Sequence, residues 1–481
     1  MGYLIRIKAF ADQRSLFEWC SFFVVLNLIL RLLFITRPDV QLDEPFSIYH
    51  AGVSWDDLWG MMKNENNPPL HFVFLKCWAS ITGFSVFALR LPSALFASFA
   101  VIFVVLIGEK YFKRHTGFIA AVLYTFSTPV MYHSHEVRVY ALFIFISSAS
   151  FYVFFKYLET EKLKWVLLLG LLNTVVVYSH FVGWFVIGIQ GLSVLISYRN
   201  DFIGMIKRGL LLCIPVVFYL PYIAIFFSKV KGFSKGTWVD APTLFDLYRM
   251  FYKFLNEPLL EILFIVLLLV YISYAVYTKY VSGILLKYRI TLILWWTVPL
   301  IGLWVYSFYT PIYISRYVVF GIPGLCLFLA LMLSTLNEWI PKFAPYIIAI
   351  FLILFIGSTN LVADGRASIK SEWGKIAELK DQNTSVIIAP DWYNKDFAYH
   401  YEGGKYFREG IKMETALMSV GVYGFNKYTN EDSLIQCCLK DKVIVFHFDD
   451  DHLINKRLLE SMKKNYSQEV IISDRVSLYK K

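Results

Sequence analysis

The chain has 481 residues, of which 57% are hydrophobic, 18% are aromatic and only 17% are charged. Because soluble domains carry about 25% charged residues, this composition excludes an ordinary soluble protein and predicts one that lies in a membrane. The formal net charge of +10 does not predict a nucleic-acid partner, because the positive residues gather in short loops between apolar runs.

Apolar runs of roughly 18 to 22 residues recur along the chain, each long enough to cross a membrane as a helix. We predict about eleven such helices, the first over 19–36, the third over 117–132 and the last over 344–361. The predicted fold class is therefore a polytopic all-α membrane protein. The N-terminal run has no small-residue cleavage site, which favours a retained span over a signal peptide.

The loops between these runs differ in charge. Those on one side are short and rich in lysine and arginine, whereas the long loop 37–88 on the other side contains six acidic residues. The positive-inside rule then predicts a multi-pass protein of the plasma (inner) membrane, with a cytoplasmic N-terminus and loop 37–88 outside. The positive residues predicted to be cytoplasmic are Arg6, Lys8, Arg14, Lys110, Lys113, Arg114, Lys156, Lys162, Lys164, Arg199, Lys207, Arg208, Lys279, Lys287 and Arg289.

Loop 37–88 is expected to contain helices that lie at the outer membrane interface. The segment from Pro68 to Gly83 is apolar, but after its prolines it is too short to cross a 30 Å hydrocarbon core. The segment from Phe46 to Met62 resembles a second such helix, with Trp55 and Trp59 four residues apart on one face. A third is expected within the outer loop 229–258. We assign residues 1–361 to one transmembrane domain.

The composition changes at about residue 362, where the chain becomes charged and gains short strand-like runs at 385–390, 442–448 and 469–480. Helix-compatible stretches separate these runs. Residues 362–481 are therefore predicted to form a small soluble α/β domain. With eleven spans before it, this domain is extracytoplasmic.

Polar residues gather at the predicted outer ends of the spans. Asp43 and Glu44 follow the first span in LDEPFSIYHAG, and Arg316 opens the tenth span in YISRYVVFGIP. A carboxylate at a membrane interface can remove a proton from a hydroxyl, and an arginine suits bidentate contact with a phosphate. Together they suit sugar transfer from a lipid phosphate. The remaining candidates are Glu136, Arg138 and Tyr140 in HSHEVRVYAL and His180 in YSHF.

These motifs resemble the polyprenyl-phosphate-sugar-dependent glycosyltransferases with the C-type membrane fold. This family 39-type group includes protein O-mannosyltransferases and bacterial aminoarabinose transferases. LDEPFSIYHAG resembles the Asp-Glu pair of the first outer loop, which implies that Asp43 is the catalytic base with Glu44 beside it. NPPLHFVFLKCWASITG, followed by ALRLPSAL, resembles the PPL segment, which adds His71 to the substrate-binding residues. Asn67 stands where some members have a lysine.

HSHEVRVYAL resembles the second acidic loop of the family, which implies substrate-binding roles for Glu136, Arg138 and Tyr140. SRYVVFGIPG resembles the RY segment, in which Arg316 would meet the lipid phosphate with Tyr317 beside it. The resemblance implies a glycosyltransferase that moves a monosaccharide from a polyprenyl-phosphate donor to an acceptor hydroxyl at the outer face, with inversion. The donor sugar would be a hexose or pentose, mannose first, and the acceptor a lipid, glycan or protein, with membrane lipids around the enzyme.

Several alternatives stay open. The protein could be a transporter or flippase of a lipid-linked glycan, or a C-type oligosaccharide ligase. Asp43 and Glu44 could cap a helix, Glu136 and Arg138 could form a local ion pair, and Arg316 could anchor at the interface. The six cysteines show no metal spacing, so no metal site is predicted, although a divalent cation stays open as a cofactor.

Overall fold

The computed structural model divides the chain into two compact units. The first comprises Met1–Pro38, Met62–His71 and Arg90–Ala363, and the second comprises Asp39–Met61, Phe72–Leu89 and Asp364–Lys481. Arg6, Lys8, Arg14 and Lys279, predicted to be cytoplasmic, lie outside the described residues. The structure describes residues 15–62, 65, 67–233, 239–278, 286–362, 369–407, 412–426, 429–430, 434, 440–448 and 452–481.

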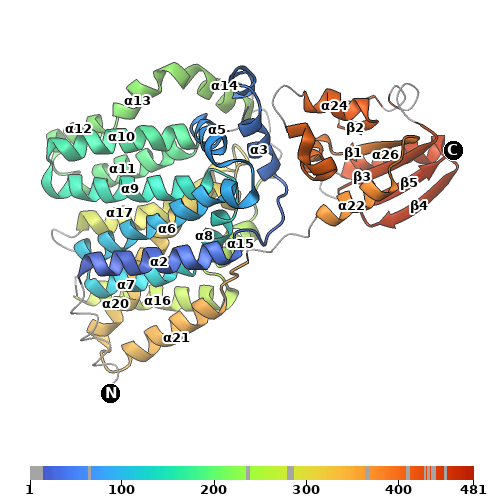
Figure 1. Cartoon of the computed structure of the whole chain (residues 1–481). Helices are drawn as coiled ribbons and strands as arrows, with labels where there is room; N and C mark the ends of the chain where they lie inside the picture. Colours follow the sequence, from blue (N-terminus) through green and yellow to red (C-terminus); the bar gives the residue numbers. More distant parts are fainter. Residues whose placement is uncertain are drawn as a thin grey trace. The chain divides into compact units, whose positions relative to one another are not determined.

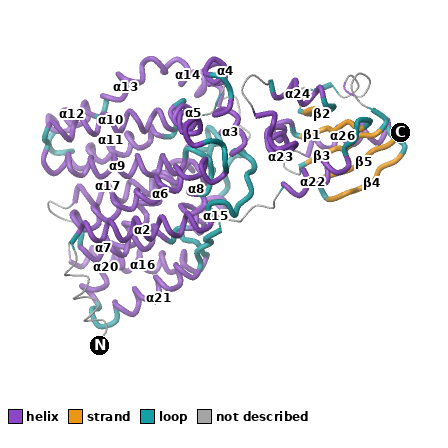
Figure 2. Tube along the Cα trace, viewed as in Figure 1, coloured by secondary structure: helices purple, strands orange, loops and turns teal. Residues whose placement is uncertain are grey.

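The first unit is a bundle of helices that run side by side (Figures 1 and 2). Among the described residues, seven helical segments are long and apolar enough to cross a membrane. The predicted polytopic helical fold is confirmed. The bundle helices are α2 (Leu16–Phe34), α6 (Val86–Tyr111), α7 (Arg114–Thr125), α8 (Thr128–Ser134), α9 (Tyr140–Thr160), α10 (Leu163–Ser179), α11 (Gly183–Ser197), α12 (Phe202–Leu211), α13 (Ile214–Tyr219), α14 (Ile223–Phe233), α15 (Leu244–Phe254), α16 (Pro258–Thr278), α17 (Leu286–Thr297), α18 (Leu303–Tyr306), α19 (Ser315–Val318), α20 (Ile322–Trp339) and α21 (Ala344–Gly357).

The third predicted span is not one helix. Instead of a continuous helix over 117–132, the structure has α7 and α8, separated by Phe126 and Ser127. Pro129 lies in the first turn of α8. In a continuous helix its ring would clash with the carbonyl of Thr125, and its missing N–H would leave that carbonyl unbonded, so the helix ends there and restarts.

A chain of buried polar side chains joins α2 to α7. Arg31 is fully buried, and its guanidinium donates hydrogen bonds to the backbone oxygen (3.2 Å) and the side-chain oxygen of Asn27. Asn27 in turn donates to Thr125 Oγ1 at 2.8 Å. A charged side chain inside an apolar bundle needs such partners, because unpaired polar groups are costly in a medium without water.

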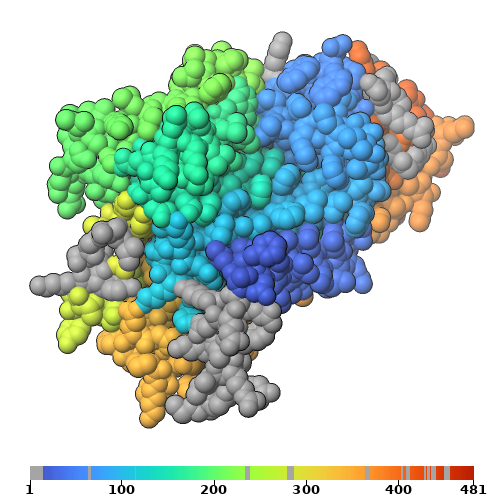
Figure 3. Space-filling model, turned by 60° about the vertical axis from the view of Figure 1, so that its left-hand side comes forward, coloured from blue at the N-terminus to red at the C-terminus, as the bar shows by residue number. Residues whose placement is uncertain are grey.

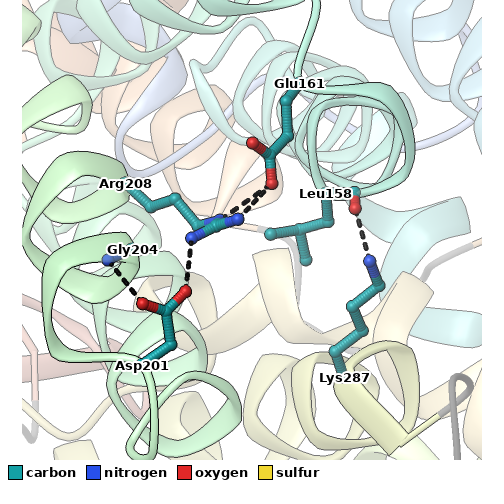
Figure 4. Close-up of polar contacts among 6 residues, drawn as sticks. All are labelled: Leu158, Glu161, Asp201, Gly204, Arg208 and Lys287. Atoms are coloured by element: carbon teal, nitrogen blue, oxygen red, sulfur yellow. Dashed lines mark hydrogen bonds and ion pairs between the residues drawn. The ribbon is translucent and has the colours of Figure 1, made fainter.

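Charged side chains from four loops meet at one end of the bundle, which we call the charged end. Lys110 Nζ lies 2.7 Å from Glu159 Oε2, and Lys156 reaches the same carboxylate. Arg208 bridges Glu161 and Asp201, and Lys287 donates to the carbonyl of Leu158 (Figure 4). Among the described residues, Lys110, Lys156, Arg208 and Lys287, four of the predicted cytoplasmic charges, thus lie at the same end of the bundle.

Two bundle segments present apolar side chains on the outside. On α2, which lies along the surface in Figure 3, Phe22, Val25, Ile29 and Leu33 are each more than half exposed and share one helix face. The helical segment Phe202–Gly232, green in the same view, is mostly unburied as well. Such faces suit contact with lipid chains.

The second unit is built on a five-stranded sheet with strand order β2-β1-β3-β5-β4. Strand β1 is parallel to β2 and β3, whereas β5 is antiparallel to both β3 and β4. The predicted strand runs are confirmed, and the run at 469–480 forms a hairpin. The strands are β1 (Thr384–Ala389), β2 (Val422–Gly424), β3 (Lys442–His447), β4 (Gln468–Ser473) and β5 (Val476–Lys480); the helices beside them are α22 (Lys370–Leu379), α23 (Asn394–His400), η5 (Tyr401–Phe407), α24 (Met413–Ser419) and α26 (His452–Asn465).

Three short helices occupy most of the first predicted outer loop: α3 (Glu44–Gly52), α4 (Trp55–Met62) and α5 (Leu70–Thr82). A single helix was expected over 46–62, but the chain breaks after Gly52. Val53 is extended, and the hydroxyl of Ser54 then caps α4 by accepting from the N–H of Asp57 at 3.1 Å.

Candidate active site

The turn between α8 and α9 carries a buried pair of polar side chains. His133 Nδ1 lies 3.0 Å from Glu136 Oε2, and both side chains are almost fully buried. Ser93, on α6, donates its hydroxyl to the backbone oxygen of Glu136 at 2.6 Å. This bond from α6 fixes the backbone at Glu136 within the turn.

Aromatic and cationic groups extend this cluster towards α10 and α19. The guanidinium of Arg138 lies 5.8 Å from the ring centroid of Tyr140, and the Tyr140 ring is 4.9 Å from that of His133. On its other side, Tyr140 lies 6.0 Å from the ring of His180, which contacts Tyr317 edge-on at 5.1 Å. Residues from three separate turns therefore form one cluster.

His180 lies in the turn between α10 and α11 and is 2% exposed. Its Nδ1 accepts a hydrogen bond from the N–H of Val182 at 3.2 Å. The neutral ring then carries its proton on Nε2, a buried donor without a protein partner among the described residues. Burial, and then the positive charges of Arg138 and Arg316, lower the pKa of His180 to about 3.

His71, in the first turn of α5, belongs to the same cluster. Burial lowers the pKa of His71 to about 3, and the nearby positive charge of Arg138 acts in the same direction. The imidazoles of His71 and His180 are therefore neutral around pH 7. The positive charges of Arg138 and Arg316 therefore lie near neutral imidazole and aromatic rings, and Glu136 is the acidic residue of the cluster.

The structure thus brings together all of the predicted substrate-binding residues in the first unit. Arg316 and Tyr317, in α19, are half-buried, and the others are buried. The members of this cluster are His71, Glu136, Arg138, Tyr140, His180, Arg316 and Tyr317.

The predicted base lies in the second unit, at the start of α3. Asp43 occupies the N-cap position, but its side chain makes no capping hydrogen bond to this helix. Glu44 is the first helical residue and is 4% exposed, with Pro45 after it. The capping role that the sequence left open for Asp43 is therefore wrong, because the N-cap backbone is helical and does not direct the side chain at the first-turn N–H groups.

Two residues that support this cluster were not predicted. His133 holds Glu136, and the His-x-x-Glu spacing was its signal in the sequence. Arg90 is fully buried and donates to the carbonyls of Ile35 (2.9 Å) and Pro38 (2.8 Å), which closes the end of α2. Arg90 had no local signal beyond its place in ALRLPSAL.

Within the described part of the chain, no three His, Cys, Asp or Glu side chains are grouped as they would be to hold a metal ion. His133 and Glu136 form a pair without a third such ligand. The cluster is thus equipped with two arginines, one carboxylate and neutral imidazoles, a set that suits an anionic, hydroxyl-rich ligand.

Residues 66–225 match the family model described as Dolichyl-phosphate-mannose-protein mannosyltransferase. This match covers α5 to α13 and part of α14, and so includes His71, Glu136, Arg138, Tyr140 and His180. A comparison with curated protein sequences finds no match.

Several solved structures share the fold. ArnT from Cupriavidus metallidurans bound to undecaprenyl phosphate is 12% identical, with a TM-score of 0.56 over 96% of this chain and 98% of that one. The oligosaccharyltransferase AglB from Archaeoglobus fulgidus, in complex with an inhibitory peptide and a dolichol-phosphate, is 11% identical, with a TM-score of 0.52 over 97% of this chain and 74% of that one. The oligosaccharyltransferase of the same organism has also been solved with Zn and sulfate, at 12% identity and a TM-score of 0.51, over 89% of this chain and 68% of that one.

The chain therefore has the C-type membrane glycosyltransferase fold of these structures, and its residues 66–225 match the model described as Dolichyl-phosphate-mannose-protein mannosyltransferase.

Proposed function

We propose that this protein transfers a monosaccharide from a polyprenyl-phosphate donor to an acceptor hydroxyl, at the outer face of the plasma (inner) membrane. The observation that carries the proposal is the chain of contacts from Arg138 through the rings of Tyr140 and His180 to Tyr317, the neighbour of Arg316, which links two arginines from different turns. Two guanidinium groups in one buried cluster match the charge of a lipid phosphate.

In this mechanism Asp43 takes the proton of the acceptor hydroxyl. The acceptor oxygen forms a bond to the anomeric carbon while the bond from that carbon to the phosphate oxygen breaks, and the configuration inverts. The electron pair leaves with the phosphate, whose charge Arg316 and Arg138 stabilise. Because phosphate leaves as a stable anion, a second carboxylic acid to protonate it is not needed, in contrast to glycoside hydrolysis.

The remaining residues position the substrates. Glu136, oriented by His133, accepts hydrogen bonds from sugar or acceptor hydroxyls, and His180 donates its Nε2 proton to an oxygen. The rings of Tyr140 and Tyr317 both contact the ring of His180 and would line the substrate beside it. His71 lies beside Arg138 and completes the set, while Glu44 stays next to the base.

The family match makes mannose the first candidate for the sugar. The acceptor is a lipid, glycan or protein, and a divalent cation is a candidate cofactor, since a relative of the same fold has been solved with Zn. We place the N-terminus in the cytoplasm and assign catalysis to residues 1–361. Because the loop charges alternate along the chain, the outer loop 37–88 and the soluble domain 362–481 would then both be extracytoplasmic.

A second candidate is the transfer of a whole oligosaccharide. The similarity in fold to the archaeal oligosaccharyltransferase favours it. The two candidates differ in the donor: one accepts a lipid monophosphate carrying a single sugar, and the other requires a longer glycan.

The test uses the purified protein in liposomes with radiolabelled polyprenyl-phosphate mannose, a panel of other monosaccharide donors and a lipid-linked oligosaccharide. We expect label to move from a monosaccharide donor to a water-soluble or lipid acceptor, with inversion seen by NMR. Label that only changes leaflet would support a flippase, and transfer from the oligosaccharide donor alone would support the ligase.

A further inference from the structure

We propose that Asp396, in the C-terminal soluble domain, is a positioning residue that holds the backbone next to the base Asp43. This inference rests on the proposed function for the role of Asp43, while the contacts themselves lie entirely within the second unit. It assigns to the soluble domain a defined part in catalysis that is separate from acceptor binding.

The contact is a direct one between side chain and backbone. Oδ2 of Asp396 accepts a hydrogen bond of 2.6 Å from the N–H of Leu42, the residue before Asp43. Oδ1 of the same carboxyl accepts from the indole N–H of Trp373 at 2.8 Å. Asp396 is only 1% exposed, so both oxygens are used inside the protein. Hydrogen bonds of 2.6 to 2.8 Å lie at the short end of the usual range.

The backbone that Asp396 holds is strained. Leu42 has a φ of +58°, in the left-handed region that a residue with a Cβ rarely adopts. Such a conformation costs about 1 kcal/mol or more and persists only where surrounding contacts enforce it. On the other side of Leu42, His400 Nε2 lies 2.8 Å from the carbonyl oxygen of Val40. Two side chains of α23 thus fix two consecutive peptide units ahead of Asp43.

The helix after Asp43 is held by the same part of the domain. Lys395 lies 4.2 Å from the ring centroid of Phe46, and the ring of Tyr49 contacts that of Phe407 at 5.4 Å. At Gly52 a Cβ would come within 2.5 Å of the carbonyl oxygen of Phe407, so the end of α3 lies directly against η5. The segment that bears Asp43 is therefore anchored before and after the carboxylate.

A carboxylate is well suited to this role because its two oxygens serve two donors. In Asp396→Asn, one oxygen becomes an NH₂ group, which cannot accept the N–H of Leu42 or of Trp373. The strained turn then loses a contact that enforces it, and Asp43 shifts or moves. Misplacement of a catalytic group by about 1 Å can cost a hundredfold in rate, so a positioning residue affects turnover without touching substrate.

The experiment compares Asp396→Asn with the matched control Asp391→Asn in the purified full-length protein. Asp391 lies in the same domain and accepts a hydrogen bond from Asn426 at 2.7 Å, away from Leu42. For Asp396→Asn we expect kcat to fall about tenfold to a hundredfold while the donor KM changes less than about threefold. Amide hydrogen exchange in peptides covering 39–44 should rise at least about tenfold. Asp391→Asn should leave both unchanged.

The exchange measurement separates this inference from the proposed function. If wild-type protein transfers no sugar but Asp396→Asn still loosens 39–44, the proposed function fails and the structural part of the inference stands. Unchanged exchange at 39–44 in Asp396→Asn, or loss of kcat equal to that in Asp391→Asn, would overturn the inference. If Asp396→Asn fails to fold, His400→Leu takes its place, because it removes the contact with Val40. We expect this variant to raise amide exchange in the same peptides. Unaltered exchange in His400→Leu would also refute the inference.

Discussion

His133 Nδ1 lies 3.0 Å from the Oε2 atom of Glu136, three residues further along the chain. The pair is buried, and Ser93 holds the backbone of Glu136 from α6. A carboxylate held in this way has little freedom to turn, and preorganisation of this kind makes a polar group effective towards a substrate. Glu136 is therefore the cluster residue whose amide variant is most informative.

We expect Glu136→Gln to lower kcat/KM for sugar transfer about tenfold to a hundredfold, because the amide is uncharged and cannot accept hydrogen bonds at both positions. His133→Asn should lower it less. Glu159→Gln, at the charged end, is the matched control and should stay within about twofold of wild type. Steady-state transfer assays check all three; equal losses in Glu136→Gln and Glu159→Gln would contradict a role for Glu136.

The arginines should control donor affinity. Arg316→Lys keeps the charge but loses the planar fork that bonds a phosphate twice, so the donor Kd should rise about tenfold, and more in Arg316→Ala. Arg138→Lys should behave similarly. Binding of polyprenyl phosphate measured by calorimetry checks this. Arg208→Lys is the control. The guanidinium of Arg208 bridges Glu161 and Asp201 at the charged end, so this variant should bind the lipid normally. Unaltered binding in both site variants would show that the phosphate lies elsewhere.

Stability should depend on pH through Asp396. Burial raises the pKa of Asp396 to about 7, with Glu44 and Asp39 adding to the rise and the bonds from Trp373 and Leu42 opposing it. A carboxyl with a raised folded-state pKa contributes stability that is fully present below the unfolded value, near 3.9, and is lost as the pH rises towards 7.

The melting temperature of wild type relative to Asp396→Asn should therefore be highest near pH 4.5 and fall as the pH approaches 7, then level off. His400, 3.8 Å from Asp396, and Lys370, which pairs with Asp39, are further titratable groups close by, and burial lowers the pKa of His400. Differential scanning fluorimetry in detergent between pH 4.5 and 8.5 measures this difference. A constant difference across the range would contradict the raised pKa.

The buried pair Asn27 and Arg31 should be strongly coupled. Asn27→Leu removes the side-chain acceptor of the Arg31 guanidinium and leaves only the backbone oxygen of residue 27, and breaking such a buried contact costs about 3 kcal/mol or more. Arg31→Met alone should cost less. The double variant should recover part of the loss, because no buried charge remains. Melting temperatures of the three variants check this; simple addition of the two single losses would show no coupling.

The sequence was sufficient for the helices of the bundle and for strands β1, β3, β4 and β5, because hydrophobic length and strand alternation are local properties. The break between α7 and α8 was missed because Pro129 lies inside an apolar run that is long enough to suggest one span. A proline inside a helix nevertheless interrupts it. The break between α3 and α4 was also missed, although Gly52 and the Ser54 cap with Asp57 mark it locally in the sequence.

The candidate site was predictable residue by residue but not as an arrangement. Each of Glu136, Arg138 and His180 was singled out by its motif, whereas their convergence depends on how α9, α10 and α19 pack. Asp396 had no signal at all. In the sequence it resembles an ordinary acidic residue in the first turn of a soluble helix, and only the bond to Leu42, distant along the chain, distinguishes it.

The proposed mechanism depends most on Asp43, as the base for sugar transfer from a lipid phosphate. The most direct measurement is the turnover of Asp43→Asn beside its binding of the polyprenyl-phosphate donor, both in liposomes. We predict that transfer falls at least about a thousandfold while the donor Kd stays within about threefold of wild type, because asparagine is isosteric but cannot take the proton. Normal turnover by Asp43→Asn would show that Asp43 is not the base.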